Sequence, residues 1–263
     1  MKACAMWPAA LALALALHAM PLHATEPAVA AGPTPLRMAH TEAMAYPLLT
    51  VSGPNKLSGG FLKELGDQIA AELGTQAQHL LVSRRRMQAT VMGGEADIAC
   101  YFSPLWLPGT GDNWTVAVVP QVERVVSLAA TPLAFEGAQD LHGRRIAVLL
   151  GYQFPQLQAA FEAGLITRLD ERQVDLLFRR VRLGMADAMI TSEVEIAGYF
   201  KRYPQERERF HISSRSFSVT DTQCLVSPAS AWRLAAINEV LLRLIKSGAV
   251  ARLAQRYGMS SGR

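Results

Sequence analysis

The sequence lacks the signatures of most enzyme classes. Its 263 residues contain no HExxH zinc motif, no paired CxxC motifs, no GxSxG nucleophile, no lysine phosphate loop and no dinucleotide fingerprint. It also lacks a strong charge bias, since Lys plus Arg number 26 against 22 Asp plus Glu, and only 84–86 is a basic run. We therefore expect no enzyme activity, no metal, no cofactor and no nucleic-acid partner.

Long apolar runs are scarce as well. The longest covers 9–17 (AALALALAL), follows Lys2, and is shorter than the about 20 residues that a membrane-spanning helix needs. This pattern is typical of a cleaved export signal. We expect a signal peptide over 1–24, with cleavage after Ala30 as the alternative, and a flexible lead-in over 25–35. The rest of the chain is then expected in the periplasm.

Cysteine is nearly absent, with three in the chain. Only Cys100 and Cys224 would remain after cleavage, and each lies in an apolar, strand-like segment. An oxidising compartment permits a disulfide between them. We expect instead two buried free thiols, because the sequence does not show whether the two backbones approach each other.

Strand-like and helix-like segments alternate after the lead-in. We expect strands at 36–41 and 79–83, and apolar residues at helical spacing predict a helix over 62–73 between them. A short helix over 87–92 precedes a buried strand at 96–100. This order indicates an α/β fold with a mostly parallel sheet.

The same order of segments then occurs a second time. Gly94-Glu-Ala-Asp97 in the first half matches Gly184-Met-Ala-Asp187 in the second. We infer two similar α/β lobes. We expect the first lobe over 36–121 plus 227–258 and the second over 122–226.

Two extended segments connect the halves. They cover 116–130, which is rich in valine and alanine, and 218–226. A chain that crosses twice between lobes forms a hinge, and the cleft between hinged lobes is a natural ligand site.

The ordered motifs, from the strand at 36–41 to the tail Leu244-Ile-Lys-Ser-Gly248, resemble solute-binding protein family 3 of the type II periplasmic binding proteins. The resemblance covers about 36–258. It implies a two-lobe periplasmic binding protein-like II fold that closes over a small molecule. It also implies a monomer that delivers its ligand to an ABC permease. The alternatives are a partner of a membrane sensor and an enzyme similar to cyclohexadienyl dehydratases.

The ligand-reading positions of this family are altered here. Trp106 and Gly109 stand where amino-acid binders carry the threonine and the arginine that clamp a carboxylate. Ser192 stands where they often carry the aspartate that holds an ammonium group, and Tyr152 replaces a frequent threonine. We therefore expect a ligand that is not a standard polar amino acid, with an acidic or aromatic compound preferred.

The candidate ligand contacts fall at expected strand ends. The first half contributes His40, Tyr46, Arg84, Arg85, Arg86, Tyr101, Phe102, Ser103 and Trp106. The second half contributes Tyr152, Gln153, Thr191, Ser192 and Glu193.

Each type of candidate has a functional and a structural interpretation. The arginine run can hold a carboxylate or phosphate, or can be a solvated run of charges. The aromatic residues can stack on a ligand or can line the core of the lobe. His40 can face the cleft or can be structural, and Glu193 can hold a cation or form an exposed salt bridge. The helix start at Tyr152 and Gln153 favours an anion.

Overall fold

The structure is a computed structural model that describes Met1 and residues 34–53 and 56–259. The expected signal peptide and nearly all of the expected lead-in lie outside the described residues, apart from Met1. Among the described residues, no helix combines the length and the apolar character that a membrane crossing requires.

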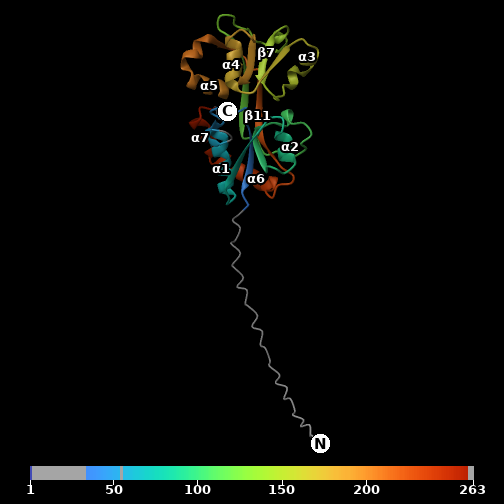
Figure 1. The fold of residues 1–263 in the computed structure, drawn as a ribbon. Coiled ribbons are helices and arrows are strands. Elements are labelled where there is room, and N and C mark those ends of the chain that lie inside the picture. Colours follow the sequence, from blue (N-terminus) through green and yellow to red (C-terminus); the bar gives the residue numbers. More distant parts are fainter. Residues whose placement is uncertain (2–33, 54–55, 260–263) are drawn as a thin grey trace. The chain divides into compact units, whose positions relative to one another are not determined.

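The first lobe is built on a sheet whose two inner strands are almost entirely buried. In spatial order its strands are β4 (Ala77–Val82), β1 (Leu36–Thr41), β5 (Ile98–Phe102) and β11 (Ser218–Val226). β1 is parallel to both neighbours, and β11 is antiparallel to β5. The helices of this lobe are α1 (Phe61–Glu72), α2 (Met87–Met92), α6 (Leu234–Lys246) and α7 (Ala249–Arg256) (Figure 1). A small hairpin pairs β2 (Thr50–Val51) with β3 (Leu57–Gly59).

The second lobe repeats this pattern. Its strands are β6 (Val119–Leu128), β9 (Ala188–Ser192), β7 (Arg145–Leu149), β8 (Thr167–Glu171) and β10 (Phe210–Ile212). Its helices are α3 (Gln158–Glu162), α4 (Val174–Arg182) and α5 (Glu193–Arg202) (Figure 1). Short 3-10 turns occupy Pro104–Trp106, Ala138–Leu141, Pro155–Leu157 and Pro204–Arg209. Most of the expected elements are present, and β8 is the strand that the repeated order implies for the second lobe. The β2–β3 hairpin, α5 and β10 were not expected from the sequence.

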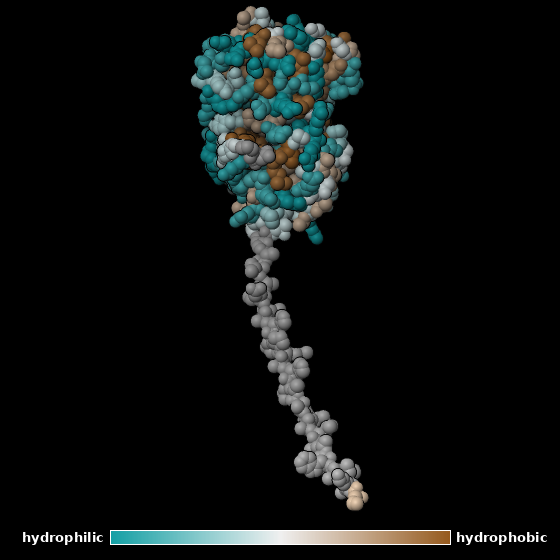
Figure 2. Space-filling view, in the orientation of Figure 1, coloured by the Kyte–Doolittle hydropathy of each residue, from teal (hydrophilic) through white to brown (hydrophobic). Residues whose placement is uncertain are grey.

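Both expected crossing segments are strands, β6 and β11. The first half of β11, 218–222, pairs with β6, and the second half, 223–226, pairs with β5. The strands therefore form one continuous hydrogen-bonded path rather than two separate sheets. The division into lobes lies in the packing, because the apolar side chains form one cluster around β1, β5 and α1 and two others around β7, β9 and α4. Hydrophilic residues cover most of the face seen in Figure 2, with groups of hydrophobic ones between them.

The repeated Gly-x-Ala-Asp word has the same structural role in both lobes. Asp97 accepts hydrogen bonds from the backbone N–H of Arg37 (2.8 Å) and from its guanidinium (2.8 and 3.0 Å). Asp187 accepts the same bonds from Arg145, at 2.7 Å to the backbone and 2.8 Å to Nη2. Each aspartate thus anchors the first residues of its lobe's leading strand, which explains why the word occurs twice.

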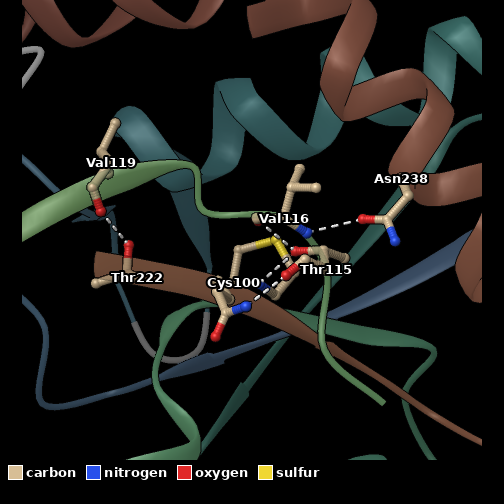
Figure 3. Close-up of a disulfide and its surroundings, with 8 residues drawn as sticks. Cys100, Thr115, Val116, Val119, Thr222 and Asn238 are labelled. Carbon is tan, nitrogen blue, oxygen red and sulfur yellow. Dashed lines mark hydrogen bonds between the residues drawn. A yellow bond between two sulfur atoms is a disulfide. The ribbon is translucent and has the colours of Figure 1, made fainter. Parts of the chain in front are cut away.

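The prediction of two free thiols is wrong, because Cys100 and Cys224 form a disulfide (Figure 3). The two residues lie opposite each other on the neighbouring strands β5 and β11. Thr115 Oγ1 accepts a hydrogen bond from the backbone N–H of Cys224 at 2.9 Å, beside the Asn238 amide that holds Val116 N–H at 2.8 Å. A separation of 124 residues hid this pairing from the sequence. The disulfide joins the crossing strand β11 to the centre of the first lobe.

Candidate ligand-binding site

A cleft of about 860 Å³ separates part of the first lobe from part of the second. This volume lies within the usual range for small-molecule sites, about 300–1,000 Å³. The lining residues of the first lobe are Arg84, Arg85, Gln88, Leu105, Trp106, Leu107 and Pro108. Those of the second lobe are Gly151, Gln153, Pro155, Gln158, Arg168 and Asp170.

A second, much smaller space lies between the lobes. It measures about 10 Å³, which is close to the minimum that a single water molecule occupies, about 10–15 Å³. Its lining residues are Met44, Arg84, Tyr101, Phe102, Trp106, Gln121, Glu123, Tyr152 and Gln153. We call this space the inner pocket and the larger one the outer cleft. Arg84, Trp106 and Gln153 line both, and the inner pocket is nearly closed in this structure.

Arg84 is the cation at the junction of the two spaces. Its residue is only 7% exposed, and its guanidinium lies 5.0 Å from the ring centre of Phe102 and 5.6 Å from that of Tyr152. Nη2 donates a hydrogen bond to the carbonyl oxygen of Trp106 at 3.3 Å. Burial lowers the pKa of Arg84, and among the described residues no carboxylate forms an ion pair with it. A buried, unpaired guanidinium is costly, so this position is suited to an anion.

The other two arginines of the run differ from Arg84. Arg85 is exposed and lines the outer cleft, whereas Arg86 points away and pairs with Glu95 at 3.4 Å. Gly151 of the second lobe lies against the two cleft arginines. A Cβ at this glycine would lie 3.3 Å from Arg85 Cγ and 3.4 Å from Arg84 Cγ, and its φ of +80° also favours glycine. Arg84 and Arg85 therefore contact the second lobe through their aliphatic stems as well.

The aromatic candidates form a wall of the inner pocket. Tyr101 and Phe102 are buried, and Tyr101 has a left-handed φ of 68°. The Tyr101 hydroxyl has no hydrogen-bond partner in the described part of the chain. Burial, and to a lesser extent the charge of Glu195, raises the pKa of this hydroxyl. Ser103 instead caps the turn that follows, because its Oγ accepts from Leu105 N–H at 3.3 Å. The structure therefore brings Tyr101, Phe102 and Trp106 to the site and leaves Ser103 outside it.

Two buried carboxylates near the inner pocket were missed by the sequence analysis. Glu123 on β6 and Glu195 on α5 are 6% and 4% exposed. Burial raises the pKa of Glu123 to about 7, against the hydrogen bond from Ser218 and with a further contribution from Glu195. Burial also raises the pKa of Glu195. The sequence contained a signal for Glu123. It lies four residues after Val119 and two before Val125 on β6, and residues at this spacing share one face of a strand.

The second-lobe candidates at the end of β9 support Glu195. Thr191 Oγ1 and Ser192 Oγ donate to Glu195 Oε2 at 2.8 and 2.9 Å, and Ser192 also caps α5. Glu193 forms an ion pair with Arg124, Nε to Oε1 2.6 Å, which is the salt bridge named as its alternative. None of the three lines the outer cleft or the inner pocket. Tyr152 and Gln153, in contrast, line the inner pocket.

His40 and Tyr46 also lie elsewhere. His40 is buried in the first lobe, where its Nε2 is 2.9 Å from His79 Nδ1, and His79 in turn contacts Asp67 at 2.9 Å. Burial lowers the pKa of His40 to about 3, so this imidazole is neutral. The structure thus contradicts the cleft placement of His40, because strand β1 directs it into the lobe.

Tyr46 connects the lobes away from the cleft. Its hydroxyl accepts a hydrogen bond from Lys201 Nζ of α5 at 2.9 Å. Its carbonyl oxygen lies so close to Gly198 of α5 that a Cβ there would be 2.0 Å from it. The loop that carries Tyr46 therefore packs directly on α5, which only a glycine at 198 permits.

The charged groups that line the outer cleft are mostly cationic. Among the residues that the structure describes, no three His, Cys, Asp or Glu side chains group so that they could hold a metal ion. The outer cleft offers Arg84 and Arg85 without acidic partners, while Arg168 is paired with Asp170 at 2.9 Å. The site therefore carries excess positive charge beside aromatic rings, and the carboxylates lie deeper.

Comparison with known proteins shows the fold. No protein-family model matches the sequence, and no curated protein matches it. Solved structures match at low identity over most of their length. An ancestral arginine-binding protein bound to arginine has a TM-score of 0.71 at 19% identity, covering 84% of this chain and 97% of that chain. The protein thus has the two-lobe fold of periplasmic binding proteins.

Two further matches are named for different roles, one for transport and one for sensing. An arginine transport system periplasmic binding protein from Legionella pneumophila has a TM-score of 0.68 at 15% identity, covering 86% of this chain and all of that chain. A histidine kinase sensor domain with similarity to periplasmic binding proteins has a TM-score of 0.67 at 17% identity, covering 85% and 95%. The same fold thus occurs in transport and in sensing.

Proposed function

We propose that the protein is an exported solute-binding protein that closes its two lobes over a small anionic molecule. The observation that carries this proposal is Arg84, a buried guanidinium without a carboxylate partner among the described residues, at the junction of the outer cleft and the inner pocket. A bound anion would supply the missing charge and form charge-assisted hydrogen bonds.

The surroundings of Arg84 favour an anion with a flat, apolar part. Phe102 and Tyr152 lie on either lobe at cation–π distance from the guanidinium, and Trp106 lines both spaces. An aromatic or unsaturated carboxylic acid would place its carboxylate on Arg84 and its apolar part against these rings. A ligand that contacts both lobes would also favour closure, because it stabilises only the closed arrangement.

The fold supports two settings for such a protein. Delivery to an ABC permease in the periplasm is our preferred setting, and a membrane sensor is the alternative, as the two kinds of structural neighbour suggest. We propose a monomer without enzyme activity. Turnover of prephenate or arogenate by the purified protein would favour the enzymatic alternative instead.

A thermal-shift screen tests the proposal directly. The probes are succinate, citrate, benzoate, phenylacetate and phosphate, with putrescine as a cationic control. A bound probe stabilises the native state by about 2.7 kcal/mol at a hundredfold excess over Kd. We expect at least one carboxylic acid to raise Tm, and we expect Arg84→Gln to abolish the shift.

Arg86→Gln is the matched control, because Arg86 belongs to the same run but pairs with Glu95 outside the cleft. It should keep the shift of the unaltered protein. A flat response to all anions, or equal shifts in the two variants, would contradict the proposal.

Standard polar amino acids provide a second test. Gly109 and Ser192 stand where amino-acid binders of the resembled family carry the arginine and the aspartate that hold the ligand. Each charge-assisted hydrogen bond that is lost there would contribute about 1.5–3 kcal/mol. We expect weak or no binding of glutamate, glutamine, arginine, lysine, histidine and cystine in calorimetric titrations. Micromolar affinity that survives alanine at 84, 85 and 86 would show a different mode of recognition.

A further inference from the structure

Glu123 and Glu195 come together at the point where the two crossing strands meet the second lobe. On β6, Glu123 is paired with Ser192 of β9 on one side and with Ser218 of β11 on the other. Glu195 lies in the first turn of α5, which starts directly after Ser192. The fold therefore places two carboxylates next to the inner pocket.

Within the described part of the chain, only neutral groups donate hydrogen bonds to these carboxylates. Glu123 accepts from Gln121 Nε2 at 3.3 Å and from Ser218 Oγ at 2.6 Å. Oε2 of Glu195 accepts from two hydroxyls, whereas its buried Oε1 has no hydrogen-bond partner among the residues that the structure describes. A buried carboxylate usually has a cation or several N–H donors, so this arrangement favours the uncharged form.

The other titratable groups around the pair do not supply a compensating charge. Tyr101 on β5 and Tyr152 after β7 are neutral phenols that burial keeps protonated, and burial is the main cause of the raised pKa of each. Arg84, from the loop after β4, lines the same inner pocket as Glu123 but forms no ion pair with either carboxylate among the described residues. Arg84 is stacked between rings instead.

We propose that closure of the lobes over Glu123 and Glu195 takes up protons, so that the site closes and holds its anion more tightly at acidic than at alkaline pH. The part that concerns the anion rests on the proposed function. Ionised carboxylates beside the inner pocket would repel an anion bound to Arg84, whereas protonated ones would not. The two acids therefore regulate the same site that Arg84 creates.

The direction of the effect follows from the two states. In the closed form, burial raises the pKa of Glu123 from 4.5 to about 7. Opening of the lobes would admit water to the inner pocket and return the pKa of Glu123 toward 4.5. Between these values, the closed form holds a proton that the open form releases. Acidification therefore favours closure, by a factor on the order of a hundred for one such group.

Small-angle X-ray scattering of the ligand-free protein tests this linkage without a known ligand. We expect the radius of gyration to increase from pH 5 to pH 8.5 as the lobes open. In Glu123→Gln and in Glu195→Gln, the amide imitates the protonated acid, so each variant should open less over this range than the unaltered protein, and the double variant should stay closed. Glu239→Gln alters an exposed glutamate on α6 and should behave like the unaltered protein.

The outcomes separate this inference from the proposed function. The proton linkage would be overturned if the radius of gyration were the same at all pH values. It would also be overturned if the radius changed in both site variants as much as it does in the unaltered protein. Affinity for benzoate or phenylacetate that rises with pH would also overturn it, because ionised carboxylates beside Arg84 should repel these anions. If no anion of the screen binds but the scattering changes as expected, the proposed function fails while the linkage stands.

Discussion

Asp97 and Glu123 are both buried carboxylates, yet their surroundings differ completely. Asp97 lies within one lobe, where hydrogen bonds from Arg37 and Ser230 outweigh the effect of burial and keep its pKa below the usual value. Glu123 lies between the lobes, where burial dominates and raises its pKa to about 7. The contrast teaches that the lobe around Asp97 supplies the donors that stabilise its charge. The surroundings of Glu123 do not, so its charge is relieved only by a proton or by an opening of the lobes.

The largest change in the free energy of unfolding is expected for Asp97, whose charge is stabilised by hydrogen bonds within its lobe. Asp97→Ala should lower the free energy of unfolding by about 2–4 kcal/mol, because the backbone N–H of Arg37 and the hydroxyl of Ser230 lose their buried acceptor. The side chain of Asp97 is 2% exposed, whereas that of its counterpart Asp187 is 30% exposed. Asp187→Ala should therefore cost only about 1–2 kcal/mol. Urea unfolding at pH 7 measures the free energy of unfolding of both variants. Equal losses would show that the burial of Asp97 does not make it more important than Asp187.

Replacement of Glu123, which lacks such hydrogen bonds from charged groups among the described residues, should instead increase the free energy of unfolding. Glu123→Gln should raise the free energy of unfolding relative to the unaltered protein by at most about 3 kcal/mol at pH 8, because opening of the lobes relieves part of the penalty, and by little at pH 4. The reason is that a raised pKa contributes a penalty that grows as pH rises from the ordinary value, 4.5, to about 7. Urea unfolding from pH 4 to pH 8 measures this difference. A difference that does not depend on pH would contradict it.

The unpaired guanidinium predicts a smaller gain. Arg84→Met should stabilise the ligand-free protein by about 1 kcal/mol while it removes anion binding, because an uncompensated buried charge is replaced by an apolar side chain. Arg86→Met should change stability by less than about 0.5 kcal/mol, since its ion pair with Glu95 is exposed. Thermal unfolding compares the two, and a clear loss of stability in Arg84→Met would show that Arg84 has a structural role.

The smallest effect concerns the phenols. Tyr101→Phe should leave stability unchanged or raise it by less than about 1 kcal/mol, because the Tyr101 hydroxyl has no partner. Tyr257→Phe is the matched control, and it should lose about 1 kcal/mol because its hydroxyl donates to Glu64. If Tyr101→Phe lost as much as the control, the hydroxyl would have a partner in solution.

Much of the fold could be predicted from the sequence, because its causes are local. Apolar periodicity predicts β1, α1 and α4, and the repeated Gly-x-Ala-Asp word predicts two similar lobes. The helix α5 was missed because its first residue, Glu193, was interpreted together with Thr191 and Ser192 as the end of a strand. Its start is marked by the capping serine, Ser192, which hydrogen-bonds to Glu195 N–H at 3.2 Å.

The site was predicted only in part, because its geometry depends on which strand ends meet. The sequence placed Arg84, Arg85 and Arg86 together as one basic run, but the turn before α2 directs Arg84 inward and Arg86 outward. His40 was expected at the cleft because it lies near the end of a strand, yet it lies inside the lobe beside His79. One residue of difference along a strand reverses the face on which a side chain lies.

The sequence by itself determined the alternation of strands and helices, the repeated lobes and the two crossing segments, since these follow from residue order and local spacing. Only the tertiary structure decided the disulfide between Cys100 and Cys224, the pairing of Glu123 with Ser218, and the position of Glu195 near both. These contacts join residues that are far apart in the chain. They depend on β11 lying between β5 and β6, and local sequence does not specify which strands become neighbours.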